Sequence, residues 1–105
     1  MNNKNVSNSF QVFMKEAPAY SKAWMELVQK LDAANNLDEK TGEIAYVAVL
    51  AAVGLESGIP FHVKRAKELG ATREEIKSAI LIGLPAVGNK VVKGLPIALD
   101  AFDEM

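Results

Sequence analysis

The feature that most constrains this chain is a run of twelve apolar residues, Ile44 to Leu55, between Glu43 and Glu56. Asp38 suits the N-cap of a helix that would run to about Glu56. From Ile44 onward this helix is apolar on every side, which is typical of a helix buried all round. A bilayer span needs about 20 such residues, so we expect the run to lie in a protein interior, and no membrane partner.

A domain of 105 residues has few elements of its own to place around such a helix. Burial against another copy of the chain covers the remaining faces, a solution that helical homo-oligomers commonly use. The sequence therefore predicts an obligate homo-oligomer.

Helical periodicity runs through the rest of the chain, and no alternating strand pattern competes with it. The predicted fold is all-α, a compact bundle of about six helices. They cover approximately residues 9–17, 18–32, 38–56, 60–69, 73–84 and 91–102.

Local signals mark several boundaries. Pro18 and Pro60 suit the first turn of a helix, where a missing N–H costs nothing. Gly70 fits the position just after a helix, where positive φ is needed. Thr72 and Glu75 match a capping box.

The core is expected to take Trp24 and Tyr46, with their polar tips satisfied. The last two helices are expected to bury the apolar residues that recur at helical spacing, namely Ile76, Ile80, Leu84, Val92, Leu95, Leu99 and Phe102.

Length and charge bound the function. We expect one domain over residues 1–105, with residues 1–8 loose. The 12 basic and 13 acidic residues give a net charge of −1, which argues against a nucleic-acid partner. The start of the sequence lacks an apolar signal region, and a cytoplasmic location is expected.

Cysteine is absent and histidine occurs once. These counts argue against a disulfide framework, a CxxC redox pair and a metal site within one chain. No glycine-rich phosphate loop is present, so no metal and no cofactor are expected.

His62 is the first candidate for chemistry. It shares a helical stripe with Ile59 and Ala66, whereas Lys64 and Arg65 fall largely on the opposite, solvated side. It is therefore expected to point inward. It is either a core imidazole satisfied by one hydrogen bond, or a proton shuttle, since imidazole changes charge near neutral pH.

Glu43 is the second candidate, because it lies just before the apolar run. Its carboxylate either compensates the dipole of the helix or is partly desolvated and acts as an acid or base.

Distance speaks against a direct pairing of the two. If the helices are straight and the turn lies near Ser57, the axial mismatch between Glu43 and His62 is about 13 Å at about 1.5 Å per residue. Contact then requires an interrupted helix, a histidine from elsewhere in the oligomer or a bridging water. Glu56, nearer the turn, is the alternative carboxylate for His62.

The stretch from Leu37 to Gly88 carries several fragments in a fixed order: LDEKTGE, the helix of small apolar residues, His62, GATREEI beginning eight residues later, and a glycine-containing break. In these fragments the chain resembles the carboxymuconolactone decarboxylase family, which includes the alkylhydroperoxidase D-like proteins. The resemblance implies an all-helical fold that assembles into trimers or hexamers.

The alkylhydroperoxidase D-like branch carries a glutamate, two cysteines and a histidine at fixed spacing. On this chain Glu43 and His62 take the glutamate and histidine positions, and the cysteine positions hold Leu55 and Gly58. Thiol-dependent peroxide reduction and disulfide exchange need a thiolate, so that chemistry is excluded. The decarboxylase branch works on lactone acids without this cysteine pair, and the resemblance implies that Glu43 and His62 belong with it.

Two hypotheses follow. The chain is an enzyme that uses His62 and a carboxylate for proton transfer on a small carboxylated or lactone compound, with an apolar, roomier pocket at Leu55 and Gly58. Alternatively, it is a non-catalytic oligomeric binding or structural module that keeps the fold. An accessible imidazole with a carboxylate in hydrogen-bond reach favours the first hypothesis, and a sealed imidazole favours the second.

Overall fold

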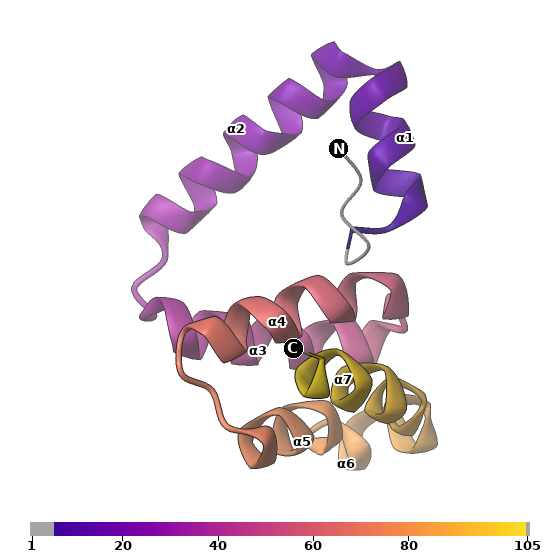
Figure 1. Ribbon diagram of the computed structural model, residues 1–105. Coiled ribbons are helices and arrows are strands. Elements are labelled where there is room, and N and C mark those ends of the chain that lie inside the picture. Colours follow the sequence, from indigo (N-terminus) through magenta and orange to yellow (C-terminus); the bar gives the residue numbers. More distant parts are fainter. Residues whose placement is uncertain (1–5, 105) are drawn as a thin grey trace. The chain divides into compact units, whose positions relative to one another are not determined.

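The computed structural model describes residues 6–104, and within that range every regular element is helical (Figure 1). In chain order the elements are α1 (Asn8–Glu16), α2 (Pro18–Ala34), α3 (Glu39–Val53), the 3-10 helix η1 (Glu56–Gly58), α4 (Ile59–Glu68), α5 (Arg73–Leu81), α6 (Leu84–Val87), the 3-10 helix η2 (Gly88–Lys93) and α7 (Gly94–Asp103). The prediction of an all-α fold is confirmed. The six expected helices correspond to α1–α5 and α7.

The chain divides into two compact units, Met1–Leu37 and Asp38–Met105. Of the segment 1–8, which was expected to be loose, residues 1–5 lie outside the described part. Ser7 is the N-cap of α1, because its hydroxyl accepts a hydrogen bond from the Phe10 N–H. The expectation of a single domain stays a prediction.

The first unit consists of α1 packed against α2. In its described part only Ser21 is buried, and the Ser21 hydroxyl donates to the carbonyl of Pro18. Trp24 is 47% exposed, so its predicted core position is wrong within this unit. Two helices have too little apolar surface to enclose a stripe of large side chains.

The hydrophobic core lies in the second unit, where four helices close a ring of contacts. Helix α3 packs against α4 and α5, and both of these pack against α7. The core comprises residues that are at least 95% buried: Val47, Leu50, Ala51, Ile59, Val63, Ala66, Ala71, Ile76, Ala79, Ile80, Val91, Ala98 and Ala101. Ile76 and Ile80 are therefore buried as predicted.

Helix α7 packs on the core through more residues than predicted. Leu95 and Phe102 are partly buried against the core, as predicted. The buried residues of the helix are Gly94, Ala98 and Ala101, whereas Val92 lies in η2 and is exposed. A Cβ atom at Gly94 would lie 3.0 Å from Cδ1 of Ile59. Small residues occupy the most buried face because they let α7 approach α4 closely. Hydrophobicity alone does not reveal this requirement for small side chains.

The α5–α7 segment also departs from expectation at Leu84, which is exposed. By length and composition alone, residues 73–103 are apolar enough to resemble a membrane span. In the structure the segment is divided into α5, α6, η2 and α7, and its buried side chains pack in the core.

Helix α3 is buried on one side only. Val47, Leu50 and Ala51 face the core, while Tyr46 and Val49 are about half exposed. The prediction of a core position for Tyr46 is wrong for a single chain, because the ring of four helices covers only one side of α3. Burial of the remaining faces of α3 against another copy stays a prediction.

Helix α3 also ends earlier than predicted. Gly54 adopts a left-handed conformation with φ +79° and donates its N–H to the Leu50 carbonyl. The chain then returns through Leu55 and η1 into α4. The reversal therefore lies at Gly54 rather than near Ser57.

Other boundaries form as predicted. Gly70 has φ +103°. The Thr72 hydroxyl accepts from the Glu75 N–H at 3.1 Å, and the Thr72 N–H donates to the Glu75 carboxylate at 2.9 Å. This backbone hydrogen bond lowers the pKa of Glu75. The capping box is confirmed.

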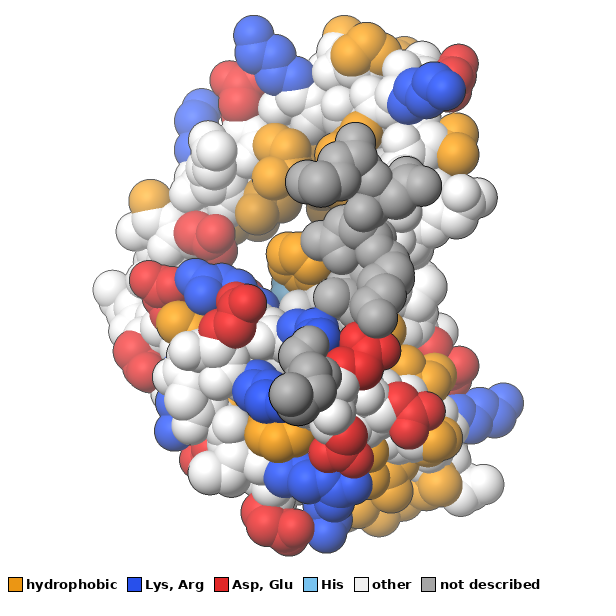
Figure 2. Space-filling model, viewed as in Figure 1, with side chains coloured by type: hydrophobic (Ala, Val, Ile, Leu, Met, Phe, Trp, Pro, Cys, Tyr) orange, Lys and Arg blue, Asp and Glu red, His pale blue; other side chains and the backbone are white. Residues whose placement is uncertain are grey.

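The end of α7 is fastened by ion pairs. Arg73 donates to both oxygens of Asp103, at 2.9 and 3.0 Å, and this contact lowers the pKa of Asp103. Lys64 donates to Glu104 at 3.2 Å. Figure 2 shows Lys and Arg side chains interspersed with Asp and Glu on the visible face of this unit.

We predict that Gly54→Ala lowers the free energy of unfolding by about 1 kcal/mol, because a residue with a Cβ is strained at positive φ. Gly58→Ala is the matched control, since Gly58 has helical φ and ψ and its Cβ would lie 3.4 Å from Leu50. Its stability is expected to change little. Urea denaturation followed by circular dichroism measures the stability of both variants. Equal losses of unfolding free energy in the two variants would contradict a left-handed conformation at Gly54.

Candidate functional site

The structure brings the two principal sequence candidates together. Nδ1 of His62 lies 2.7 Å from Oε1 of Glu43. The two side chains are 26% and 23% exposed, so the pair is mostly buried but not sealed. His62 is partly accessible and has a carboxylate in hydrogen-bond reach.

The predicted axial mismatch between them is wrong because the reversal lies at Gly54. From Glu43 to the end of α3 the chain rises about 15 Å. On the return, η1 rises about 6 Å at the wider 3-10 spacing, and α4 rises about 6 Å more up to His62. The remaining few ångströms are within reach of the two side chains. Neither an interrupted helix nor a bridging water is needed.

The hydrogen bond fixes which imidazole nitrogen is available. An ionised carboxylate can only accept, so a neutral His62 donates its Nδ1–H to Glu43 and keeps a lone pair on Nε2. Within residues 6–104, Nε2 has no hydrogen-bond partner. Nε2 is therefore the nitrogen that can exchange a proton with a ligand.

Two aromatic rings hold the imidazole. The Tyr46 ring lies with its centroid 4.5 Å from that of His62, tilted by 58°. Phe61 meets His62 edge-on at 5.1 Å. Tyr46 follows Glu43 by three residues, so both project from the same face of α3. Together these contacts restrain the plane of the imidazole ring.

Sequence reasoning missed both rings as site residues. The three-residue spacing from Glu43 to Tyr46 and the adjacency of Phe61 to His62 were available signals. They became informative only once the register between α3 and α4 was known.

The other sequence candidates lie apart from this hydrogen bond. The carboxylate that reaches Nδ1 belongs to Glu43 and not to Glu56. Leu55 is 60% exposed, and Gly58 packs against Leu50. Their expected role as pocket residues stays a prediction.

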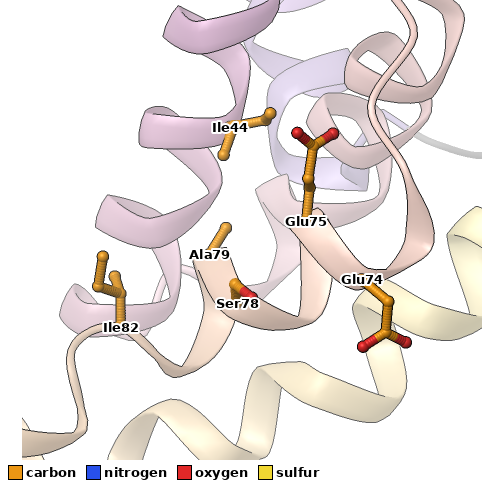
Figure 3. Close-up of a pocket in the computed structure, with 6 residues that line it drawn as sticks. All are labelled: Ile44, Glu74, Glu75, Ser78, Ala79 and Ile82. Atoms are coloured by element: carbon orange, nitrogen blue, oxygen red, sulfur yellow. The ribbon is translucent and has the colours of Figure 1, made fainter.

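A shallow groove of about 320 Å³ lies between α3 and α5 (Figure 3). In Figure 3, Ile44 faces the small side chain of Ala79, with Ile82 at one end and Glu75 at the other. Its remaining lining residues are Glu74 and Ser78. None of these residues belongs to the His62 site, so we assign the candidate chemistry to the hydrogen-bonded pair rather than to the groove.

In the part of the chain that the structure describes, no three His, Asp or Glu side chains converge as a metal site. The expectation of no metal and no cofactor stays a prediction. The site instead offers one base, one orienting carboxylate and two aromatic rings.

The all-helical fold, the Glu43–His62 pair and the absence of cysteine agree with the resemblance to the alkylhydroperoxidase D-like proteins. The profile of the carboxymuconolactone decarboxylase family matches residues 18–100. The chain belongs to this family.

Two relatives illustrate the match. The uncharacterized protein MJ1511 of Methanocaldococcus jannaschii is 28% identical over 99 residues, which cover 90% of this chain and 92% of that protein. The crystal structure of apo-lpg0406, a carboxymuconolactone decarboxylase family protein from Legionella pneumophila, matches with a TM-score of 0.76 and 28% identity. That match covers 90% of this chain and 85% of the Legionella chain.

We predict that neutral His62 carries its proton on Nδ1 in the wild-type protein. Nitrogen-15 NMR measures this directly, and the chain has one histidine, so the signal needs no further assignment. Glu43→Gln is expected to shift the population toward the Nε2–H form, since an amide can also donate. An unchanged tautomer in the variant would show that Glu43 does not set it.

Proposed function

We propose that this chain is a thiol-independent enzyme that transfers a proton on a small carboxylated or lactone compound. His62 acts as the acid and base, and Glu43 orients it. The observation that carries this proposal is the 2.7 Å hydrogen bond to Nδ1, which leaves Nε2 free.

When His62 acts as a base, Nε2 takes a proton from a substrate carbon next to a carbonyl, and the electron pair of the broken C–H bond moves into the carbonyl system. Glu43 stabilises the imidazolium that forms, as the carboxylate does in a catalytic triad. In a decarboxylation the bond to the leaving CO₂ breaks, its electron pair stays on the substrate carbon, and the imidazolium donates its proton there. Proton abstraction and proton donation after loss of CO₂ therefore use the same two side chains, His62 and Glu43.

Absence of cysteine limits the family's chemistry here. Peroxide reduction through a thiolate pair requires sulfur at the positions that hold Leu55 and Gly58. We further propose a cytoplasmic location, because the chain has no cysteine for the disulfides common in exported proteins.

The alternative is a non-catalytic oligomeric module, and one observation favours an oligomer under either function. The outward face of α3 carries Ala45, Tyr46, Val49 and Val53, all exposed in one chain. An exposed apolar face of this kind is stabilised when another copy of the chain covers it, which supports assembly. We propose a trimer or a hexamer.

For the enzyme, a screen of lactones and small carboxylic acids for deuterium uptake at carbon or for CO₂ release tests turnover. His62→Gln is expected to lower the rate by about 10²–10⁴-fold, and Glu43→Gln should lower it less, because the base remains. Arg73→Gln, on α5, is the control. Activity that persists in His62→Gln would refute the role of His62.

For the oligomer, Val49→Asp is expected to shift the assembly toward the monomer, because a charge would be buried at the contact. Asn89→Asp introduces the same charge at an exposed polar position of η2, outside the outward face of α3, and should leave the assembly intact. Analytical ultracentrifugation reads the mass. A wild-type protein that is monomeric at micromolar concentration would end this proposal.

A further inference from the structure

A second charged pair lies one turn away from the Glu43–His62 pair on the same two helices. Arg65 follows His62 by three residues on α4, and Glu39 precedes Glu43 by four residues on α3. Nη2 of Arg65 donates to Oε2 of Glu39 at 2.8 Å. Residues at these spacings are neighbours on one helix face, so the guanidinium lies beside the candidate site.

The Arg65–Glu39 contact is exchangeable. The side chains are 40% and 74% exposed, and exposed ion pairs of this kind are weak and compete with other anions. Glu39 accepts a hydrogen bond from Nη2 alone. Nη1 is 3.9 Å from the Glu68 carboxylate, which is beyond hydrogen-bond distance. Arg65 therefore keeps donors for a planar carboxylate.

The other basic residues of α4 hold the end of α7. Lys64 donates to the Glu104 carboxylate, and Lys67 donates to the Phe102 carbonyl. Both contacts fasten the C-terminal segment. Of the three basic residues on α4, Arg65 is the one whose partner comes from the helix that also carries Glu43.

The order of groups along α3 and α4 matches an amphipathic ligand. The guanidinium of Arg65 lies at one end, His62 is in the middle, and the rings of Tyr46 and Phe61 contact the imidazole. The Cβ atoms of residues three apart on a helix are roughly 5–6 Å apart. That separation suits a small acid whose carboxylate reaches Arg65 while its reactive carbon lies beside Nε2.

We propose that Arg65 is the specificity-determining residue of this site and binds the carboxylate of a small carboxylated compound. Glu39 is the resident competitor that the ligand's carboxylate displaces. The inference rests on the proposed function of His62 and adds the group that selects the substrate's charge.

The test uses a small lactone that carries a carboxylate, and the methyl ester of the same compound. The ring-proton NMR signals of His62 report binding at the site without turnover. In the wild type we expect the acid to bind more tightly than the ester. Arg65→Gln should weaken binding of the acid by about tenfold or more and leave the ester unchanged, since a charged hydrogen bond is lost.

Two further variants sharpen the result. Glu39→Gln removes the competitor and should strengthen binding of the acid a few-fold, an effect that a purely structural ion pair would not produce. Arg65→Lys should bind the acid more tightly than Arg65→Gln but less tightly than the wild type, because lysine keeps the positive charge but lacks the planar pair of donors. Arg73→Gln removes an ion-paired arginine elsewhere and is the charge-matched control.

Equal weakening of acid and ester in Arg65→Gln, or equal weakening by Arg73→Gln, would overturn the inference and leave His62 as the base. Failure of both compounds to shift the His62 signals would also overturn it. The proposed function fails separately, on deuterium uptake or CO₂ release that does not depend on His62.

Discussion

The left-handed turn at Gly54 is the constraint on which the site depends. It ends α3 at Val53, and the chain then returns along α3 through η1 and α4. This register places Glu43 opposite His62 and Glu39 opposite Arg65. Two polar contacts one turn apart then follow from a single backbone conformation that glycine adopts at little cost.

Signals carried by a few adjacent residues were readable from the sequence. Gly70 and the Thr72–Glu75 box were predicted because each is a local exchange of backbone hydrogen bonds. The Glu43–His62 candidates came from family spacing together with the chemistry of the two side chains. The reversal at Gly54 was missed because that glycine is hidden inside an apolar run, where it was counted as one more interior residue.

Properties that depend on distant neighbours were not readable. The most buried face of α7 is set by how closely Gly94 approaches Ile59, whereas the periodic pattern pointed to larger residues such as Leu95 and Phe102, which are only partly buried. Trp24 and Tyr46 look like core residues by type, yet the described chain leaves both half exposed. Amphipathic periodicity identifies which side of a helix is apolar, but not how much of it one chain can cover.

Close packing at Gly94 links the site to a helix that gives it no side chain. Ile59 is the first residue of α4, and His62 stands three residues further along. A Cβ atom at position 94 would lie 3.0 Å from Cδ1 of Ile59, so the Ile59 side chain would have to shift to make room for it. The helix that carries His62 is therefore packed against α7 through a position where the absence of a side chain permits the close approach.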